Sequence, residues 1–268
     1  MSKTIGILGY GWLGTALGLQ LRSDGYEVKG STTSYEKKDL LNQKGLQPFL
    51  VQLSENGIIG EIEGLLKDVD VLVINVPPNL RKQPEGNYVK RMELLSEQIK
   101  SSGISHVVFV SSTSVYGNID GDITEDSVPH PVTNSGKQLL ASEQLFLENH
   151  SFSTAVIRFG GLIGEDRHPV NSLSGKELTN GGELINLIHR KDCILMIQTI
   201  IENNYWNEIF NGVYPFHPTK AEYYTLEARK RNIPPPIYTE SSRVVSKKKV
   251  IFRNFYVKNH LLTTSISS

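Results

Sequence analysis

Three glycines near the start of the chain have the spacing of a phosphate-binding turn. The segment G-Y-G-W-L-G at 9–14 lies between an apolar run at 5–8 and a helical pattern at 13–21. In this setting Gly9 makes a tight turn, Gly11 lets a pyrophosphate approach, and Gly14 lets helix and strand pack closely. The N–H groups of Trp12 and Leu13 would face the phosphates. The sequence therefore predicts a dinucleotide site.

The end of the second predicted strand indicates which dinucleotide binds. NAD sites usually carry Asp or Glu there, which holds the ribose hydroxyls. Here the chain carries hydroxyl residues instead: Ser31, Thr32, Thr33 and Ser34. Lys37 and Lys38 follow, and no carboxylate occurs before Glu36. This composition favours NADP over NAD, because hydroxyls and lysines suit a 2′-phosphate; the alternative is that Glu36 folds back onto the ribose.

Alternating elements must position these residues. Short β-rich runs at 5–8, 26–30, 47–53, 69–76, 106–111 and 154–158 alternate with helical patterns at 13–21, 35–44 and 88–99. The alternation predicts an α/β fold with a Rossmann-type doubly wound parallel sheet. Beyond about residue 160 the pattern loosens, and we expect a small C-terminal substrate lobe. The expected domains are 1–160 with a return at 184–215, and the lobe at 161–183 and 216–268.

Composition narrows the class of protein. The chain has 268 residues, with 28 Lys+Arg against 28 Asp+Glu and one cysteine. Zero net charge gives no general attraction to nucleic acid or to a membrane surface, and the apolar runs are too short to span a bilayer. Cys193 alone forms no internal disulfide, and residues 1–8 lack a signal segment, so we expect a cytoplasmic protein. The histidines show no metal-site spacing, and a small-molecule partner, with a homodimer as one possible assembly, is expected.

Several later segments resemble a known enzyme family. V-S-S-T-S-V-Y-G at 110–117 resembles the SS-x-SVYG segment of extended short-chain dehydrogenases/reductases. I-R-F-G-G-L-I-G at 157–164, R-H-P at 167–169 and N-L-I-H-R-K-D at 186–192 resemble further stretches of that family in the same order. With the G-x-G-W-L-G turn and P-V-T-N-S-G at 131–136, the chain resembles the atypical, YeeZ-like branch of the NAD-dependent epimerase/dehydratase family.

The resemblance implies a Rossmann fold with a substrate pocket, often for nucleotide sugars. It implies that Ser112 polarises the reacting oxygen, and Tyr116 is a second catalytic candidate. Val76, Pro77 and Ser111 are further expected cofactor contacts. The loops at the strands' carboxyl ends also offer substrate-binding candidates: Ser114, Asn134, Arg167 and His168. For His168, the roles of general acid and of an ordinary hydrogen-bonding residue both remain open.

The acid/base pair typical of the family is missing. That pair is Tyr-x-x-x-Lys, in which the lysine holds the ribose and lowers the tyrosine pKa. None of the 11 tyrosines has a lysine four residues later. Ser135 stands at the expected tyrosine position and Leu139 at the lysine position. Lys137 either reaches the site from a shifted register or is a solvated surface residue.

Two functions therefore remain open. One is an NADP-dependent oxidoreductase, or an epimerase/dehydratase-like enzyme, acting on a small polar substrate. The other is a non-catalytic NADP(H) sensor. A β-hydroxyacid-type dehydrogenase is disfavoured, because the tail cannot supply a long helical second domain. Locally, we expect Asp192 to cap a helix, 247–249 to form a solvated basic patch, and 263–268 to be poorly ordered.

Overall fold

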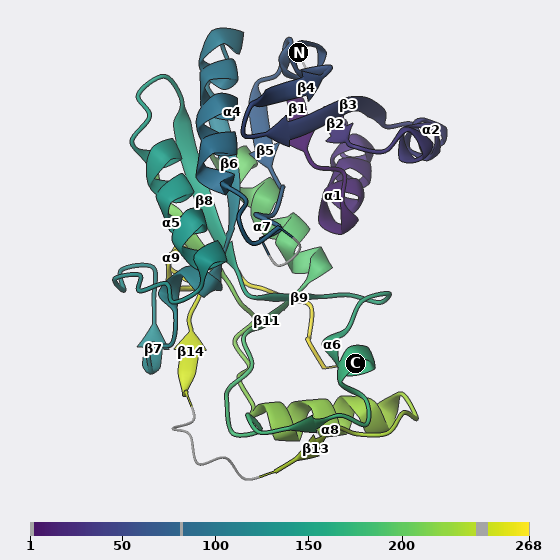
Figure 1. The fold of residues 1–268 in the computed structure, drawn as a ribbon, viewed down its shortest axis with the longest axis vertical. Coiled ribbons are helices and arrows are strands. Elements are labelled where there is room, and N and C mark those ends of the chain that lie inside the picture. The colour runs from purple at the N-terminus through teal and green to yellow at the C-terminus, as the bar shows by residue number, and fades with distance from the viewer. Residues whose placement is uncertain (1–2, 81–82, 240–245, 268) are drawn as a thin grey trace. The chain divides into compact units, whose positions relative to one another are not determined.

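A large, mostly parallel sheet organises the protein. The structure is a computed structural model that describes residues 3–80, 83–239 and 246–267. The sheet has 8 strands in the order β12-β8-β6-β5-β1-β2-β3-β4 (Figure 1). In chain order the strands are β1 (Thr4–Leu8), β2 (Glu27–Thr32), β3 (Gln47–Ser54), β4 (Gly57–Gly60), β5 (Val71–Ile74), β6 (His106–Ser112), β8 (Ser153–Phe159) and β12 (Ile209–Gly212). Neighbours from β6 to β3 pair in parallel, and β4 pairs antiparallel with β3.

Helices lie on both faces of this sheet. The helices that accompany it are α1 (Trp12–Ser23), α2 (Tyr35–Gln43), α3 (Ile62–Leu66), α4 (Tyr88–Ser102), α5 (Asn134–Leu147) and α7 (Arg190–Asn203). Helices α4 and α5 cover one face and α1 and α7 the other (Figure 1). Gln198 of α7 donates to Asp24 at the end of α1. The Rossmann-type α/β prediction is therefore confirmed.

The sequence pattern explains how the sheet is buried. All four residues of β5 are buried, as expected for a strand covered on both faces. On α1 the buried residues include Leu13, Leu17 and Leu21, at helical spacing. Gly25, with φ of +89°, follows α1 and turns the chain into β2. Because β1, β2, β3 and β5 are parallel neighbours, their carboxyl ends meet at one edge.

The chain divides into two compact units. The first comprises Met1–Ser112, Thr133–Ile157 and Ile194–Ile209, and the second comprises Thr113–Val132, Arg158–Cys193 and Phe210–Ser268. These ranges differ from the expected domain boundaries, since 113–132 clusters with the second unit. The second unit holds short parallel strand pairs: β9 (Gly161–Ile163) with β11 (Leu187–His189), β7 (Gly121–Ile123) with β14 (Lys248–Val250), and β10 (Glu177–Leu178) with β13 (Ile237–Tyr238). Its helices are α6 (Pro169–Leu173), α8 (Lys220–Lys230) and α9 (Arg253–Val257).

Two local expectations about the second unit are wrong, and a third holds only in part. Helix α7 begins at Arg190, so Asp192 does not cap it; instead, its buried carboxylate accepts from the N–H of Thr264 at 3.0 Å. The tail is packed rather than frayed, because Ile266 is 2% exposed; residue 268 lies outside the described residues. Of the solvated basic patch expected at 247–249, Lys247 is exposed, but Lys248 is half-buried and its Nζ donates to the carbonyl of Gly117 at 2.9 Å.

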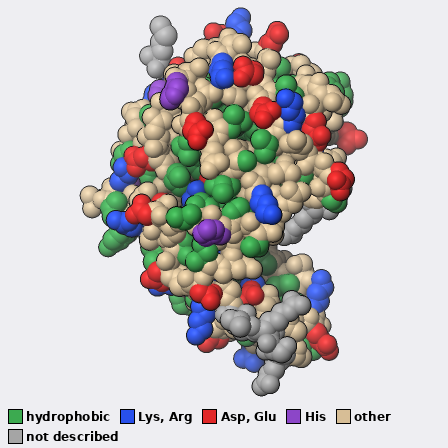
Figure 2. Space-filling view, turned by 60° about the vertical axis from the view of Figure 1, so that its left-hand side comes forward, with side chains coloured by type: hydrophobic (Ala, Val, Ile, Leu, Met, Phe, Trp, Pro, Cys, Tyr) green, Lys and Arg blue, Asp and Glu red, His purple; other side chains and the backbone are tan. Residues whose placement is uncertain are grey.

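Surface and interior show no obvious membrane or metal feature within the described part of the chain. On the face in Figure 2, acidic and basic side chains are interspersed. Among the described residues, no helix is both long and apolar enough to cross a bilayer. Over the same ranges, no group of three or more His, Cys, Asp and Glu side chains is placed to hold a metal ion.

Candidate functional site

The glycine turn between β1 and α1 is built so that glycine is required twice. Gly9 has φ of +109°, and a Cβ there would lie 2.8 Å from the carbonyl oxygen of Asn75. A Cβ on Gly14 would lie 2.1 Å from the carbonyl oxygen of Gly9. A Cβ on Gly11, in contrast, would meet no atom within 4 Å. The space beside Gly11 is therefore open to a ligand.

Two side chains from neighbouring strands hold this turn. The N–H of Gly9 donates to Ser31 Oγ at 2.9 Å, and the N–H of Tyr10 donates to the Ser31 carbonyl at 2.7 Å. From the end of β5, Asn75 Nδ2 donates to the Gly9 carbonyl at 3.3 Å. Ser31, selected from sequence as a ligand contact, thus also fixes the shape of the turn.

A cavity of about 400 Å³ opens at the carboxyl ends of β1, β2, β3 and β5. It lies within the first unit. Predicted cofactor residues that line it are Gly9, Gly11, Ser31, Thr32, Thr33, Ser34, Val76 and Pro77. Lining residues that the sequence did not indicate include Val51, Gln52, Leu53, Asn75, Asn79 and Arg91. Strand β3 lies next to β2 in the sheet, and this brings 51–53 to the cavity. No sequence motif marks these residues as cavity residues.

The remaining predicted cofactor residues lie outside the lining. Trp12 and Leu13 form the first turn of α1, and Leu13 is 3% exposed in the core. Gly14 packs α1 on the glycine turn. Ser111 is buried on β6, and its Oγ donates to Glu143 Oε1. The Leu13 side chain is therefore unavailable to a ligand, which Leu13 could contact only through its backbone N–H at the helix N-terminus.

The cavity lining is cationic. Of the described residues that line it, the charged ones are Lys37 and Arg91, and none is Asp or Glu. Lys37 Nζ donates to the carbonyl of Tyr10, which holds the ammonium beside the glycine turn. Lys38 instead pairs with Glu61 at 2.8 Å. Glu36, the carboxylate of the NAD alternative, is exposed and absent from the lining.

Hydroxyl groups crowd the end of β2. Ser34 caps α2, its Oγ accepting from the N–H of Lys37 at 3.2 Å. Thr32 Oγ1 accepts from the N–H of Ser34 at 3.3 Å. Each hydroxyl can still donate its own proton. Together with the exposed Thr33, they form a set of donors beside the Lys37 ammonium, which suits an anion.

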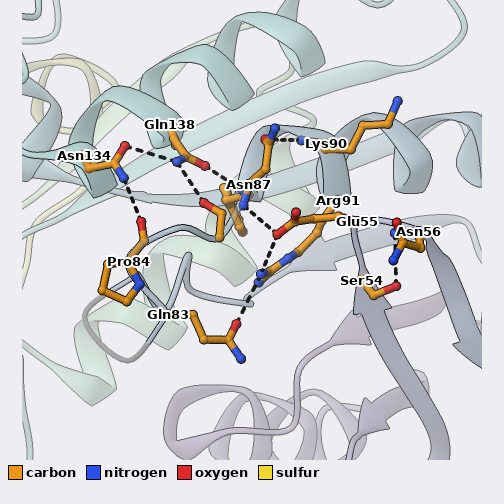
Figure 3. Close-up of polar contacts among 12 residues, drawn as sticks. Ser54, Glu55, Asn56, Gln83, Pro84, Asn87, Lys90, Arg91, Asn134 and Gln138 are labelled. Atoms are coloured by element: carbon orange, nitrogen blue, oxygen red, sulfur yellow. Dashed lines mark hydrogen bonds and ion pairs between the residues drawn. The ribbon is translucent and has the colours of Figure 1, made fainter.

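Arg91 forms the wall of the cavity near the end of β3. Its Nη2 donates to Glu55 Oε1 at 3.3 Å and to Gln83 Oε1 at 3.2 Å (Figure 3). Glu55 Oε1 also accepts from the N–H of Asn87, the N-cap of α4, at 2.7 Å. This hydrogen bond and Arg91 lower the pKa of the Glu55 carboxyl. One carboxylate thus links the β3–β4 turn to the start of α4.

The helix that carries the family's acid/base pair has neither group here. Ser135 is half-buried on α5, and Leu139 is 6% exposed in the core. Lys137 is exposed, in agreement with a solvated residue rather than one in a shifted register. Ser112 is half-buried at the end of β6, the strand that precedes α5 in the first unit.

Tyr116 is engaged within the core of the second unit. It is fully buried, and its hydroxyl donates to Asn211 Oδ1 at 2.9 Å. The same hydroxyl accepts from Arg158 Nη1 at 2.9 Å. Burial raises the pKa of Tyr116, although Arg158 opposes the shift. The Tyr116 hydroxyl is thus hydrogen-bonded to two side chains of the second unit, Asn211 and Arg158. This arrangement does not support the expected catalytic role of Tyr116.

Asn134 lies at a different place from the cavity of the glycine turn. It is the exposed first residue of α5, and its Nδ2 donates to the Pro84 carbonyl at 3.3 Å (Figure 3). Its Oδ1 accepts from Gln138 Nε2 at 3.1 Å. These three residues line a separate cavity of about 460 Å³.

The other substrate-binding candidates belong to the second unit. Arg167 is exposed in a turn with Gly164, and Ser114 is half-buried in a 3₁₀ turn that follows β6. His168 is buried and caps α6, its Nδ1 accepting from the N–H of Val170 at 3.2 Å. Its Nε2 lies 3.0 Å from the Tyr223 hydroxyl. Because both ring nitrogens are engaged, the structure favours the hydrogen-bonding role for His168.

Comparison with known proteins places this geometry in context. The chain is 31% identical over 241 residues to protein YeeZ of Escherichia coli strain K12, covering 89% of this chain and 88% of YeeZ. MoeE5, solved in complex with UDP-glucuronic acid and NAD, has a TM-score of 0.80 at 21% identity, covering 98% of this chain and 95% of MoeE5. The UDP-glucose 4-epimerase of Thermotoga maritima, solved with UDP-glucose, has a TM-score of 0.80 at 15% identity, with coverages of 98% and 94%. No family model matches the chain.

Proposed function

The chain belongs to the atypical extended short-chain dehydrogenases/reductases, in the YeeZ-like branch of the NAD-dependent epimerase/dehydratase family, and we propose that it is an NADP(H)-dependent enzyme. The proposed reaction is an oxidoreduction, or an epimerase/dehydratase-like conversion, of a small polar substrate of the nucleotide-sugar class. The ligands of MoeE5 and of the Thermotoga maritima epimerase support that substrate class. The single cysteine fits a cytoplasmic enzyme.

The observation that carries the proposal is the cavity at the glycine turn. Its residues fit a dinucleotide, because the open space beside Gly11 admits a pyrophosphate that a side chain would exclude. The first turn of α1 contains no acidic residue, so its N–H groups and positive helix end can hold an anion. We propose that the pyrophosphate binds there.

The preference for NADP rests on the end of β2. We propose that the 2′-phosphate binds between the hydroxyls of Ser31–Ser34 and the Lys37 ammonium, both of which line the cavity. A carboxylate would accept the ribose hydroxyls of NAD and repel that phosphate. Of the described lining residues none is acidic, which supports NADP over NAD.

The chemistry would take place beside Ser112. A bound nicotinamide supplies or accepts a hydride. In the proposed role, the Ser112 hydroxyl donates a hydrogen bond to the substrate oxygen on the carbon that exchanges hydride, and so stabilises negative charge there. Ser135 and Leu139 offer no equivalent of the usual acid/base pair, so Ser112 is the residue of the family's motif that remains.

A second function, NADP(H) sensing without turnover, is favoured by one observation. Leu139 is packed in the core where the family places the ribose-binding lysine, and Lys137 is exposed. Helix α5 is therefore well packed, but it lacks the side chains that transfer protons in the family. The two functions share the cofactor site and differ only in turnover.

Calorimetric titration of nucleotide-stripped protein with NADPH and with NADH tests the proposal first. We expect NADPH to bind at least tenfold more tightly than NADH. A panel of nucleotide sugars and small carbonyl compounds then tests turnover, with Ser112→Ala as the control that retains NADPH affinity but loses the rate. Binding without turnover on any compound would favour the sensor. Binding of neither dinucleotide would overturn both functions.

A further inference from the structure

The two cations of the cavity occupy different places along it. Lys37 Nζ donates to the carbonyl of Tyr10, a residue of the glycine turn that follows β1, and therefore lies beside that turn. Arg91 is paired with Glu55, in the turn between β3 and β4, and therefore lies at the end of β3. We propose that Arg91 contacts the adenine base of the bound dinucleotide and so acts as a base-recognition residue; this inference rests on the proposed function.

The order of the strands supports this placement of the base. The sheet runs β1-β2-β3, so the cavity passes from the glycine turn, past the hydroxyls at the end of β2, to residues 51–53 on β3. A dinucleotide with its pyrophosphate at the glycine turn and its ribose at β2 extends its base toward β3. Arg91 lies in that wall, where Leu53 and Met92 add apolar surface.

The charge balance favours a base over a second phosphate at Arg91. Glu55 offsets the charge of the guanidinium, whereas the ammonium of Lys37 is bound to a backbone carbonyl. The Arg91 side chain is 14% exposed, and Glu55 and Gln83 hold its Nη2 (Figure 3). A planar guanidinium held in this way has lost most of its side-chain freedom before binding, and it suits an aromatic ring.

A comparison of variants with two dinucleotides separates the roles of the cations. Arg91→Met is expected to weaken NADPH and NADH equally, by about tenfold. Lys37→Met is expected to weaken NADPH binding by about tenfold and NADH binding by clearly less, because only NADPH carries the 2′-phosphate. Raising the ionic strength should reduce the loss of NADPH affinity caused by Lys37→Met, because salt screens the contact with the phosphate. The loss of affinity caused by Arg91→Met should remain.

Lys90→Met is the matched control for Arg91→Met. Lys90 is on the same helix, is 49% exposed and pairs with Glu93 at 3.1 Å, and it does not line this cavity. It should bind both dinucleotides as the wild type does. Arg91→Lys controls for misfolding, because a lysine can keep the ion pair with Glu55 but lacks the planar guanidinium. This variant should also bind NADPH and NADH more weakly than the wild type does.

The possible results distinguish failure of this inference from failure of the proposed function. An Arg91→Met effect on NADPH alone would show a phosphate contact and overturn the inference. An unchanged affinity for both dinucleotides, alongside the expected Lys37→Met effect, would overturn it as well. If the wild type binds neither dinucleotide, the proposed function fails, and the inference that rests on it fails too.

Discussion

Ser111 Oγ on β6 donates a hydrogen bond to Glu143 Oε1 on α5, and both residues are buried. Glu143 lies four residues after Leu139, so it is one helical turn beyond the missing lysine position. The contact ties α5 to the strand that ends in Ser112. A buried polar pair of this kind therefore fixes the helix, although the acid/base groups that the family carries on it are absent.

Loss of this pair should destabilise the first unit. Glu143→Ala leaves the buried Ser111 hydroxyl without its acceptor, and we expect unfolding free energy to fall by about 1–3 kcal/mol. Denaturant unfolding measures the change. Glu143→Gln keeps an acceptor oxygen and should cost less than Glu143→Ala. Equal losses in the two variants would contradict the hydrogen-bond explanation.

Two glycine substitutions should separate ligand binding from folding. Gly11→Ala meets no protein atom, so it should cost at most about 1 kcal/mol of stability, the N-cap preference for glycine over alanine. It should nevertheless abolish calorimetrically detectable dinucleotide binding. Gly14→Ala clashes with the Gly9 carbonyl and should cost about 1–3 kcal/mol. Normal affinity in folded Gly11→Ala would show that no phosphate binds there.

A carboxylate at the end of β2 should reverse the cofactor preference. Thr33 is exposed and lines the cavity, so Thr33→Asp introduces a negative charge without disturbing the core. We expect NADPH to bind at least tenfold more weakly and NADH to bind as well or better. Thr33→Asn is the uncharged control and should retain the preference. A parallel change for both dinucleotides would place the 2′-phosphate elsewhere.

The second unit should lose stability in mild acid through His168. Burial, and to a lesser extent Arg231, lowers its pKa from 6.5 to about 4, although Glu227 at 3.9 Å opposes the shift. Between these values the unfolded chain binds a proton that the folded chain does not. Unfolding free energy should therefore fall as pH drops from 6.5 toward 4, by about 3 kcal/mol in all.

Thermal unfolding across that pH range measures the effect. His168→Asn keeps an N-cap acceptor for α6 and lacks the titrating ring, so its pH dependence should be smaller. An unchanged slope in His168→Asn would assign the acid sensitivity to other groups.

Local rules were sufficient for the first half of the fold. Apolar runs and glycine positions predicted β1, α1, β5 and the turn between the first two; Gly9 has a positive φ, and Gly14 leaves no space for a side chain against the turn. The cavity lining at β2 followed from the same motif. These features depend on residues close in sequence, where periodicity and turn chemistry dominate.

Long-range contacts were beyond such rules. Arg91 enters the cavity because Glu55 holds it, a pairing across 36 residues that no motif marks. Asp192 resembled a helix cap, and its partners Thr263 and Thr264 lie more than 70 residues away. Tyr116 resembled a catalytic residue until its contact with Asn211 placed it in the core. In each case a distant partner decides the role of the side chain.

The packed tail of the second unit affects when that unit can fold during synthesis. The Tyr223 hydroxyl donates to the Ile266 carbonyl at 2.5 Å, and Ile266 belongs to the apolar cluster that includes Val170 and Leu187. During synthesis this cluster stays incomplete until residue 266 has left the ribosome. Most segments of the first unit emerge earlier, so they can pack before the second unit closes. Removal of Ile266 and the residues after it would therefore leave this apolar cluster incomplete, and its exposed side chains would be recognised by chaperones and proteases.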